Sequence, residues 1–324
     1  MGKDRVRPRG AFAWALALPL LLAAGCATGG KQAPAGPLPP RPPLAEGAVH
    51  PRSADLPVDV LVESGRASAA QGNYGVAEFY FSTALAKEPG MEPALSGLGE
   101  VLRVQGRTDE ARGAFARAAE VAPDSVPARI GLGRVHRAQS RHDESLRHLR
   151  RAVELSPEDP VILEELALTY EAAGQEAFAE PLFRLAAEKT DSARAWNNLG
   201  FNYLRQKRYA DAVAPLERAV ALDGSDPVAR NNLALAYGMT GREDRALSLF
   251  EGTVGKAAAQ NNMGYLYTLQ GRWADAEAAF NRAMEINPAY YVRAKENLDR
   301  LGQLIVEQAR ENLEALQKEG GGGR

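Results

Sequence analysis

Residues 95–123, LSGLGEVLRVQGRTDEARGAFARAAEVAP, contain the pattern that decides the fold of this chain. Apolar, small and helix-breaking residues occur in it at fixed intervals. The same intervals return about every 34 residues as far as Pro288, and a fixed period of this length indicates a stack of similar units. The marker residues of the quoted copy are Leu98, Gly99, Gly106, Ala111, Phe115, Ala118 and Pro123.

Seven copies of the pattern align between residues 58 and 290. Each copy has two stretches with apolar residues at intervals of three and four, which predicts two amphipathic helices. Small residues at the eighth, twentieth and twenty-seventh positions allow helix backbones to approach closely, and a bulky residue at the twenty-fourth fills the gap. In five copies a glycine joins the two helices, as a left-handed helix terminus requires. These glycines are Gly72, Gly106, Gly174, Gly241 and Gly271.

This pattern resembles the tetratricopeptide repeat (TPR) family over residues 58–290. The resemblance implies an all-α fold: a right-handed α-solenoid of about seven TPR helical hairpins, with the first helix of each hairpin lining a concave face. An amphipathic helix over residues 291–319 is expected to cap the last hairpin. A dimerising coiled coil in its distal half is the alternative. Residues 320–324, GGGGR, are expected to be disordered.

Two departures from the repeat pattern carry structural expectations. Pro181 and Pro215 fall inside second helices and are expected to bend them modestly. The sixth copy is four residues shorter than the others, and Gly252 and Gly255 are expected to end its second helix early. A kink is therefore expected near residues 252–258.

The N-terminal region predicts export and lipid attachment. Residues 1–10 are basic and residues 11–24 are apolar, which is typical of a signal peptide over residues 1–25. The apolar stretch ends in a sequence, residues 22–26, that resembles a bacterial lipobox, so Cys26 is expected to carry lipid. An ordinary secretory signal is the alternative. Residues 26–57 are rich in proline and are expected to form an extended tether between the lipid and the repeats.

Charge and composition argue against several functional classes. The net charge is −2, and basic residues alternate with acidic ones, so no nucleic-acid partner is expected. His136, His142 and His148 are six residues apart and are interpreted as core histidines that would lie on different helix faces. The Gly131–Gly133 segment lacks a preceding strand, so it does not predict a dinucleotide site. No enzyme activity, cofactor or metal is expected.

The TPR resemblance assigns a concave binding face to particular positions of the first helices. Asparagine can donate and accept hydrogen bonds, so a ladder of asparagines is expected to pair with the amides of an extended peptide, with apolar residues between them. The family pattern itself favours asparagine at the sixth position, which is the competing explanation. The stripe of apolar residues could instead be covered by the C-terminal helix. Glu164, Glu165 and Glu171 are expected to favour a ligand with basic residues. The predicted groove residues are Asn197, Asn198, Phe201, Asn231, Asn232, Leu235, Asn261, Asn262 and Tyr265.

These features together suggest a membrane-anchored scaffold that binds an extended segment of an envelope protein. The architecture resembles that of pilotin-type lipoproteins and the repeat lipoproteins of Flp/Tad pilus assembly, which implies a role in assembling a pilus or secretion machine. Ala27, rather than aspartate, follows the lipobox, and the resemblance to the sorting of enterobacterial lipoproteins implies the outer membrane, facing the periplasm. An adaptor that docks and regulates a cell-wall hydrolase or protease is the main alternative. The substrate-recruiting half of a glycosyltransferase is a third possibility.

Overall fold

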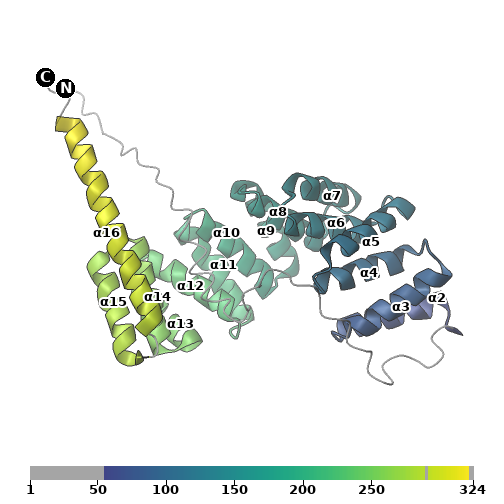
Figure 1. Ribbon diagram of the computed structural model, residues 1–324, viewed down its shortest axis with the longest axis horizontal. Coiled ribbons are helices and arrows are strands. Elements are labelled where there is room, and N and C mark those ends of the chain that lie inside the picture. The colour runs from purple at the N-terminus through teal and green to yellow at the C-terminus, as the bar shows by residue number, and fades with distance from the viewer. Residues whose placement is uncertain (1–54, 289–290, 321–324) are drawn as a thin grey trace. The chain divides into compact units, whose positions relative to one another are not determined.

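The computed structural model describes residues 55–288 and 291–320, and every regular element in these two ranges is helical (Figure 1). The expected all-α fold is therefore confirmed. The chain divides into an N-terminal unit, residues 55–195, and a C-terminal unit, residues 196–320, which are described separately. The signal peptide, Cys26 and nearly all of the expected tether lie outside the described residues.

The N-terminal unit consists of four helical hairpins. Within each hairpin a first helix packs against the second helix that follows it, and each second helix packs against the next first helix. The helices are α2 (Val58–Ala70), α3 (Tyr74–Lys87), α4 (Glu92–Val104), α5 (Thr108–Val121), α6 (Val126–Ala138), α7 (His142–Leu155), α8 (Pro160–Ala172) and α9 (Glu176–Thr190).

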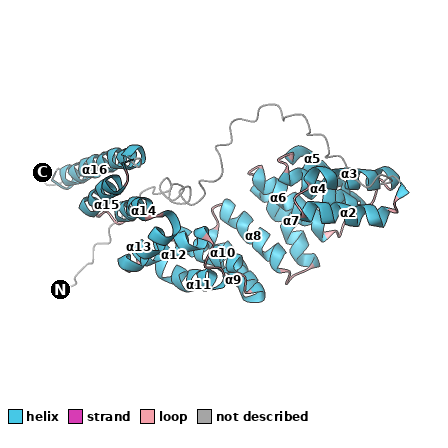
Figure 2. Ribbon diagram, turned by 90° about the horizontal axis from the view of Figure 1, so that it is seen from below, coloured by secondary structure: helices cyan, strands magenta, loops and turns pink. Residues whose placement is uncertain are grey.

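The C-terminal unit continues the same order of short helices and ends in a long one. Helix α10 begins three residues before the boundary between the units. Figure 2 shows that short loops connect the helices and that no strand occurs in the described part of the chain. The helices are α10 (Ala193–Arg205), α11 (Tyr209–Leu222), α12 (Pro227–Met239), α13 (Glu243–Val254), α14 (Lys256–Leu269), α15 (Trp273–Ile286) and α16 (Tyr291–Gly320).

The turns inside the hairpins follow the predicted chemistry. All five joining glycines have positive φ angles, between 71° and 80°. Glycine adopts this left-handed conformation without the steric penalty of a side chain. The two copies without a glycine use Ser140 and Lys207, whose φ angles are 58° and 60°. The left-handed turn is thus a constant of the hairpin even where the sequence offers no glycine.

The bulky residue at the twenty-fourth position is the centre of each hairpin core. All seven are at most 2% exposed, and in five hairpins this side chain lies against a glycine at the eighth position of the first helix. The approach is close enough that any Cβ there would collide with it, so the glycine sets the distance between helices. The seven residues are Phe81, Phe115, Leu149, Phe183, Leu216, Phe250 and Phe280.

The short sixth copy has the expected effect on its second helix. Helix α13 ends at Val254, and Gly255 alone, with a φ of 82°, separates it from α14. Four residues separate α11 from α12 at the previous junction. Pro181 and Pro215 both lie inside continuous helices, α9 and α11. None of the helices between residues 55 and 320 combines the length and apolar composition needed to cross a membrane.

Candidate binding face

The nine predicted groove residues lie on α10, α12 and α14, the first helices of three successive hairpins in the C-terminal unit. They occupy the fifth, sixth and ninth positions of their copies, which fall on one side of a helix with 3.6 residues per turn. We call them the inner row. Its members are Asn197, Asn198, Phe201, Asn231, Asn232, Leu235, Asn261, Asn262 and Tyr265.

Asparagines of the inner row bond to asparagines of the next first helix. Asn232 Nδ2 donates to Asn197 Oδ1 at 2.9 Å, and Asn297 Nδ2 of α16 donates to Asn261 Oδ1 at 2.8 Å. The donor follows the acceptor by 35 residues in the first pair and by 36 in the second. A hydrogen bond between repeats therefore recurs along this face, and α16 takes part in it.

Burial corrects the expectation of an open asparagine ladder. Asn197, Asn232, Asn261 and Asn262 are each between 4% and 9% exposed. A buried amide needs a partner inside the protein, and two of these residues obtain one from each other. Asn197, Asn232 and Asn261 join consecutive repeats through these bonds.

Asn231 is the exception in this row. Its side chain is half-buried, and its Oδ1 atom is buried without a hydrogen-bond partner. In the Asn232–Asn197 pair, a sixth-position asparagine donates to the fifth-position asparagine of the copy before it. The corresponding donor for Asn231 would be Asn262. The sixth copy is four residues short, and that bond is not made. An unpaired buried acceptor of this kind costs about 1–3 kcal/mol, so it calls for an explanation.

The apolar members of the row are covered to different degrees. Leu235 is 7% exposed and belongs to the core. Tyr265 is half-buried and packs against a cluster that contains Phe280 and Leu301 of α16. The alternative that the C-terminal helix covers the apolar stripe thus holds for Tyr265. Phe201 is half-buried.

The acidic residues of the N-terminal unit are paired within the chain. Glu165 accepts hydrogen bonds from Arg134 Nε at 2.7 Å and from Arg137 Nη1 at 2.8 Å. Glu164 accepts one from Arg194 Nη2 at 2.7 Å. These arginines were missed in the sequence, although Arg134 and Arg137 stand at the ninth and twelfth positions, which the family assigns to the concave face.

This pairing corrects the expectation of an acidic surface for a basic ligand. Glu164, Glu165 and Glu171 are all buried, between 7% and 9% exposed. The network extends to Glu100, where burial acts to raise the pKa, but the hydrogen bond from Arg103 and the charges of Arg103 and Arg134 lower it below its usual value. Glu164 and Glu165 are therefore neutralised by arginines of neighbouring repeats and do not offer a free negative charge to a basic ligand.

The histidines are placed differently from the prediction. The rings of His136 on α6 and His148 on α7 stack across one hairpin, with centroids 5.4 Å apart and planes 3° apart. His136 is 8% exposed, as a core residue should be. The spacing along the chain did not predict this contact, because the turn of the hairpin lies between His136 and His148 and brings them onto two facing helices. No group of three potential ligands suited to a metal occurs in the described residues.

The stacked histidines predict a pH-dependent stability. Burial, helped by the nearby charges of His136, Arg129 and Arg147 and opposed by that of Glu144, lowers the pKa of His148 to about 4. In the unfolded chain the pKa is near 6.5. Between these values the unfolded chain binds a proton that the folded chain does not, so stability should fall as pH decreases through this window. We expect a lower urea midpoint at pH 5 than at pH 7.5. In His148→Gln the difference should shrink, and an unchanged difference would contradict this origin.

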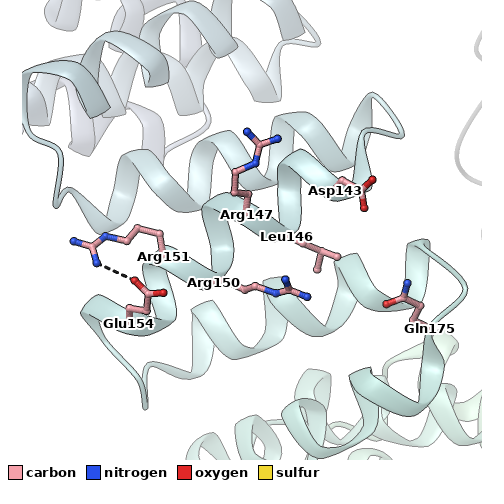
Figure 3. A pocket seen from close by; sticks show the side chains of 7 residues that line it. All are labelled: Asp143, Leu146, Arg147, Arg150, Arg151, Glu154 and Gln175. Carbon is pink, nitrogen blue, oxygen red and sulfur yellow. Dashed lines mark hydrogen bonds and ion pairs between the residues drawn. The ribbon is translucent and has the colours of Figure 1, made fainter.

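An open hollow of about 550 Å³ lies on the second helices of the N-terminal unit (Figure 3). Arg151 is paired with Glu154 at 2.9 Å, and Arg150 Nη2 donates to the Tyr170 hydroxyl at 3.0 Å. The side chain of Arg147 points away from that of Arg150. The guanidinium groups do not converge, so the hollow is not a built anion site. Its lining residues are Asp143, Leu146, Arg147, Arg150, Arg151, Glu154 and Gln175.

Family models for the tetratricopeptide repeat match almost all of the described chain. They cover residues 62–194 in three overlapping matches, and residues 193–226, 227–251 and 257–290. The chain belongs to the tetratricopeptide repeat family. Proteins built from TPR hairpins are generally non-catalytic scaffolds for protein–protein interaction, which agrees with the paired, structural character of the polar groups described above.

Solved structures of other TPR proteins have the same fold. A tetratricopeptide repeat protein from Parabacteroides merdae is 20% identical with a TM-score of 0.52, and the match covers 75% of this chain and 98% of that chain. The Cut9–Hcn1 hetero-tetramer of APC/C gives 19% identity and a TM-score of 0.53, covering 75% of this chain and 42% of that chain. The structure of Pseudomonas aeruginosa pilF is 17% identical with a TM-score of 0.52, and the match covers 64% of this chain and 97% of that chain. At such identities the likeness shows the fold alone. No curated protein matches the chain.

Proposed function

We propose that this TPR protein is a membrane-anchored scaffold whose inner row binds an extended segment of a bacterial envelope protein. The observation that carries the proposal is the unpaired Oδ1 atom of Asn231, on a face where Asn197 and Asn261 each accept a hydrogen bond from an asparagine of the next first helix. A backbone N–H group of a bound segment would supply the missing donor. The side chain as a whole is half-buried rather than enclosed.

Apolar contact would add to this hydrogen bond. Phe201 and Asn231 stand on consecutive first helices, α10 and α12, at the ninth and fifth positions. A segment that crosses these helices could place an apolar side chain on Phe201 while its backbone reaches Asn231. Extended peptides gain affinity from backbone hydrogen bonds and specificity from such side-chain contacts.

The anchor and the cellular role rest on the sequence. Cys26 and the proline-rich residues 26–57 support a lipid anchor with a tether, placed at the outer membrane and facing the periplasm. Anchored repeats of this kind suit the assembly of a pilus or secretion machine, where one protein holds another at the membrane. The likeness to pilF adds nothing to this choice, because it concerns the fold alone.

A photocrosslinking residue at position 201 tests the proposal in cells. The expected result is a covalent adduct between position 201 and one short segment of an envelope protein, recovered with the membranes and mapped by mass spectrometry. A matched probe at Phe178, which is 63% exposed on α9, should not give this adduct. The Phe201→Asp variant should weaken binding of the mapped segment about tenfold. In Cys26→Ser the protein that has not been crosslinked should move to the soluble fraction.

The identity of the adduct distinguishes the functions. A pilin or secretin supports assembly, whereas a cell-wall hydrolase or protease would replace assembly with the adaptor function. Equal adducts at positions 201 and 178 would refute the inner row as the binding face. Membrane recovery of the Cys26→Ser protein would refute the lipid anchor.

A further inference from the structure

Helix α16 docks on the C-terminal unit as the first helix of an eighth repeat. Ala294 is fully buried, as Ala229 and Ala259 are at the third position of earlier first helices. Asn297 repeats the hydrogen bond between asparagines that joins earlier copies. Leu301 is 3% exposed and packs into the cluster of Phe280. Three contacts therefore place α16 in the same register as the helices before it.

The second helix of this eighth repeat is missing from the described residues. In three earlier copies the eleventh position of the first helix is buried, at Leu102, Tyr203 and Tyr237, which are 4%, 5% and 8% exposed. The Tyr237 ring lies between the two neighbouring second helices, because its hydroxyl donates to Glu217 of α11 and Arg245 of α13 stacks on the ring. In the register of α16 the eleventh position is Gly302. It is exposed, and a Cβ built on it would meet no atom within 4 Å. The place that a second helix would fill is open.

The middle of α16 carries exposed apolar residues. Ile305 is 40% exposed and Val306 is 70% exposed. Gly302, Val306 and Ala309 follow each other at intervals of four and three, so they form a stripe along one side of the helix, away from Leu301. Small residues in such a stripe let a second helix approach closely. Figure 1 shows the C-terminal half of α16 extending beyond α14 and α15.

We propose that the open side of α16 binds α16 of a second copy of this chain, in antiparallel orientation. A second helix of a TPR hairpin runs antiparallel to the first, so each α16 would fill the vacant place of the other. The charges favour the same orientation. Residues 291–302 contain three basic and two acidic residues, whereas residues 303–320 contain two basic and four acidic residues. An antiparallel pair places the positive half of each helix on the negative half of its partner, and a parallel pair places two negative halves together.

This dimer goes beyond the proposed binding function, because the stripe lies on a different side of α16 from Asn297 and the inner row. A symmetric pair would contain the same contact twice, as expected for a two-fold interface. It would also cover the exposed surface of Ile305 and Val306.

Cysteine crosslinking of the whole chain in a Cys26→Ser background tests the orientation as well as the contact. Val306 lies near the middle of α16, so Val306→Cys should form a disulfide-linked dimer. Lys295→Cys should not, because two copies of residue 295 would be about 30 Å apart in an antiparallel pair. Val121→Cys is the matched control, since Val121 is exposed on α5, far from α16 in sequence. Crosslinking of Lys295→Cys as strongly as Val306→Cys would overturn the antiparallel pair.

Sedimentation equilibrium of the whole chain, again with Cys26→Ser, tests the affinity. We expect a dimer, and Val306→Arg should weaken self-association at least about tenfold while the melting temperature stays the same. Ile305→Ala should weaken it less. A chain that stays monomeric up to about 100 μM, or a Val306→Arg variant that dimerises like the parent, would overturn the proposal.

Discussion

Phe115→Ala is expected to lower the free energy of unfolding by about 3–5 kcal/mol. The ring is 2% exposed and lies between two first helices. A Cβ atom built on Gly99 of α4 would lie 2.9 Å from the ring, and one built on Gly131 of α6 would lie 2.2 Å from it. Glycines have no side chain that could move into the vacated space, so the cavity should persist and the full cost should appear.

Urea denaturation of the variant measures this loss. Phe178→Ala is the control, because Phe178 is 63% exposed on α9 and has only its stacking on Tyr170, with centroids 5.6 Å apart, to lose. That contact is worth about 1 kcal/mol. If Phe115→Ala costs no more than Phe178→Ala, Phe115 does not fill the space between α4 and α6.

Gly131→Ala is expected to destabilise the protein by about 2 kcal/mol, although alanine is the better helix former. In a free helix the change should stabilise by about 1 kcal/mol. Here the new methyl group would lie 2.2 Å from Cε1 of the Phe115 ring, and neither helix can move away without disturbing its other neighbours. The cost of overpacking therefore exceeds the gain in helix propensity, and the net change in stability is a loss.

Two further variants separate overpacking from helix propensity. A Cβ built on Gly113 of α5 meets no atom within 4 Å, so Gly113→Ala should stabilise by about 0.5–1 kcal/mol. In the double variant Phe115→Ala with Gly131→Ala, the methyl group occupies part of the cavity, and the total loss should be smaller than the sum of the single losses. Additive losses would mean that Gly131 acts through backbone conformation rather than through contact with the ring.

The hairpins could be predicted because every hairpin repeats the same local solution. Gly106 and Gly271 predict a left-handed turn from their own conformational freedom, and both have positive φ angles in the structure. Phe115 and Phe280 recur at the same position between small residues, and both are buried. The missing residues of the sixth copy likewise predicted the early end of α13.

The state of the candidate binding face could not be predicted in the same way. Asn232 offers the same donor and acceptor to a ligand as to a neighbouring repeat, and only its distance of 2.9 Å from Asn197 shows which one it serves. Glu165 could likewise bind a basic ligand or an arginine of its own chain, and only the structure shows that it pairs with Arg134 and Arg137 of the repeat before. The nine groove residues all lie on the first helices of three successive hairpins, but five of them are buried, and Asn231 is the one whose buried acceptor lacks a partner in the described structure.

The sequence by itself determined the repeating hairpins, their turns and the residues that fill each core, because these depend on contacts within a copy that recurs seven times. The tertiary structure decided which polar groups of one copy meet those of the next, and which side of α16 is left without a neighbour. The physical reason is that such contacts join residues about 35 positions apart, where a change in the length of one copy, such as the four missing residues of the sixth copy, changes which side chains face each other.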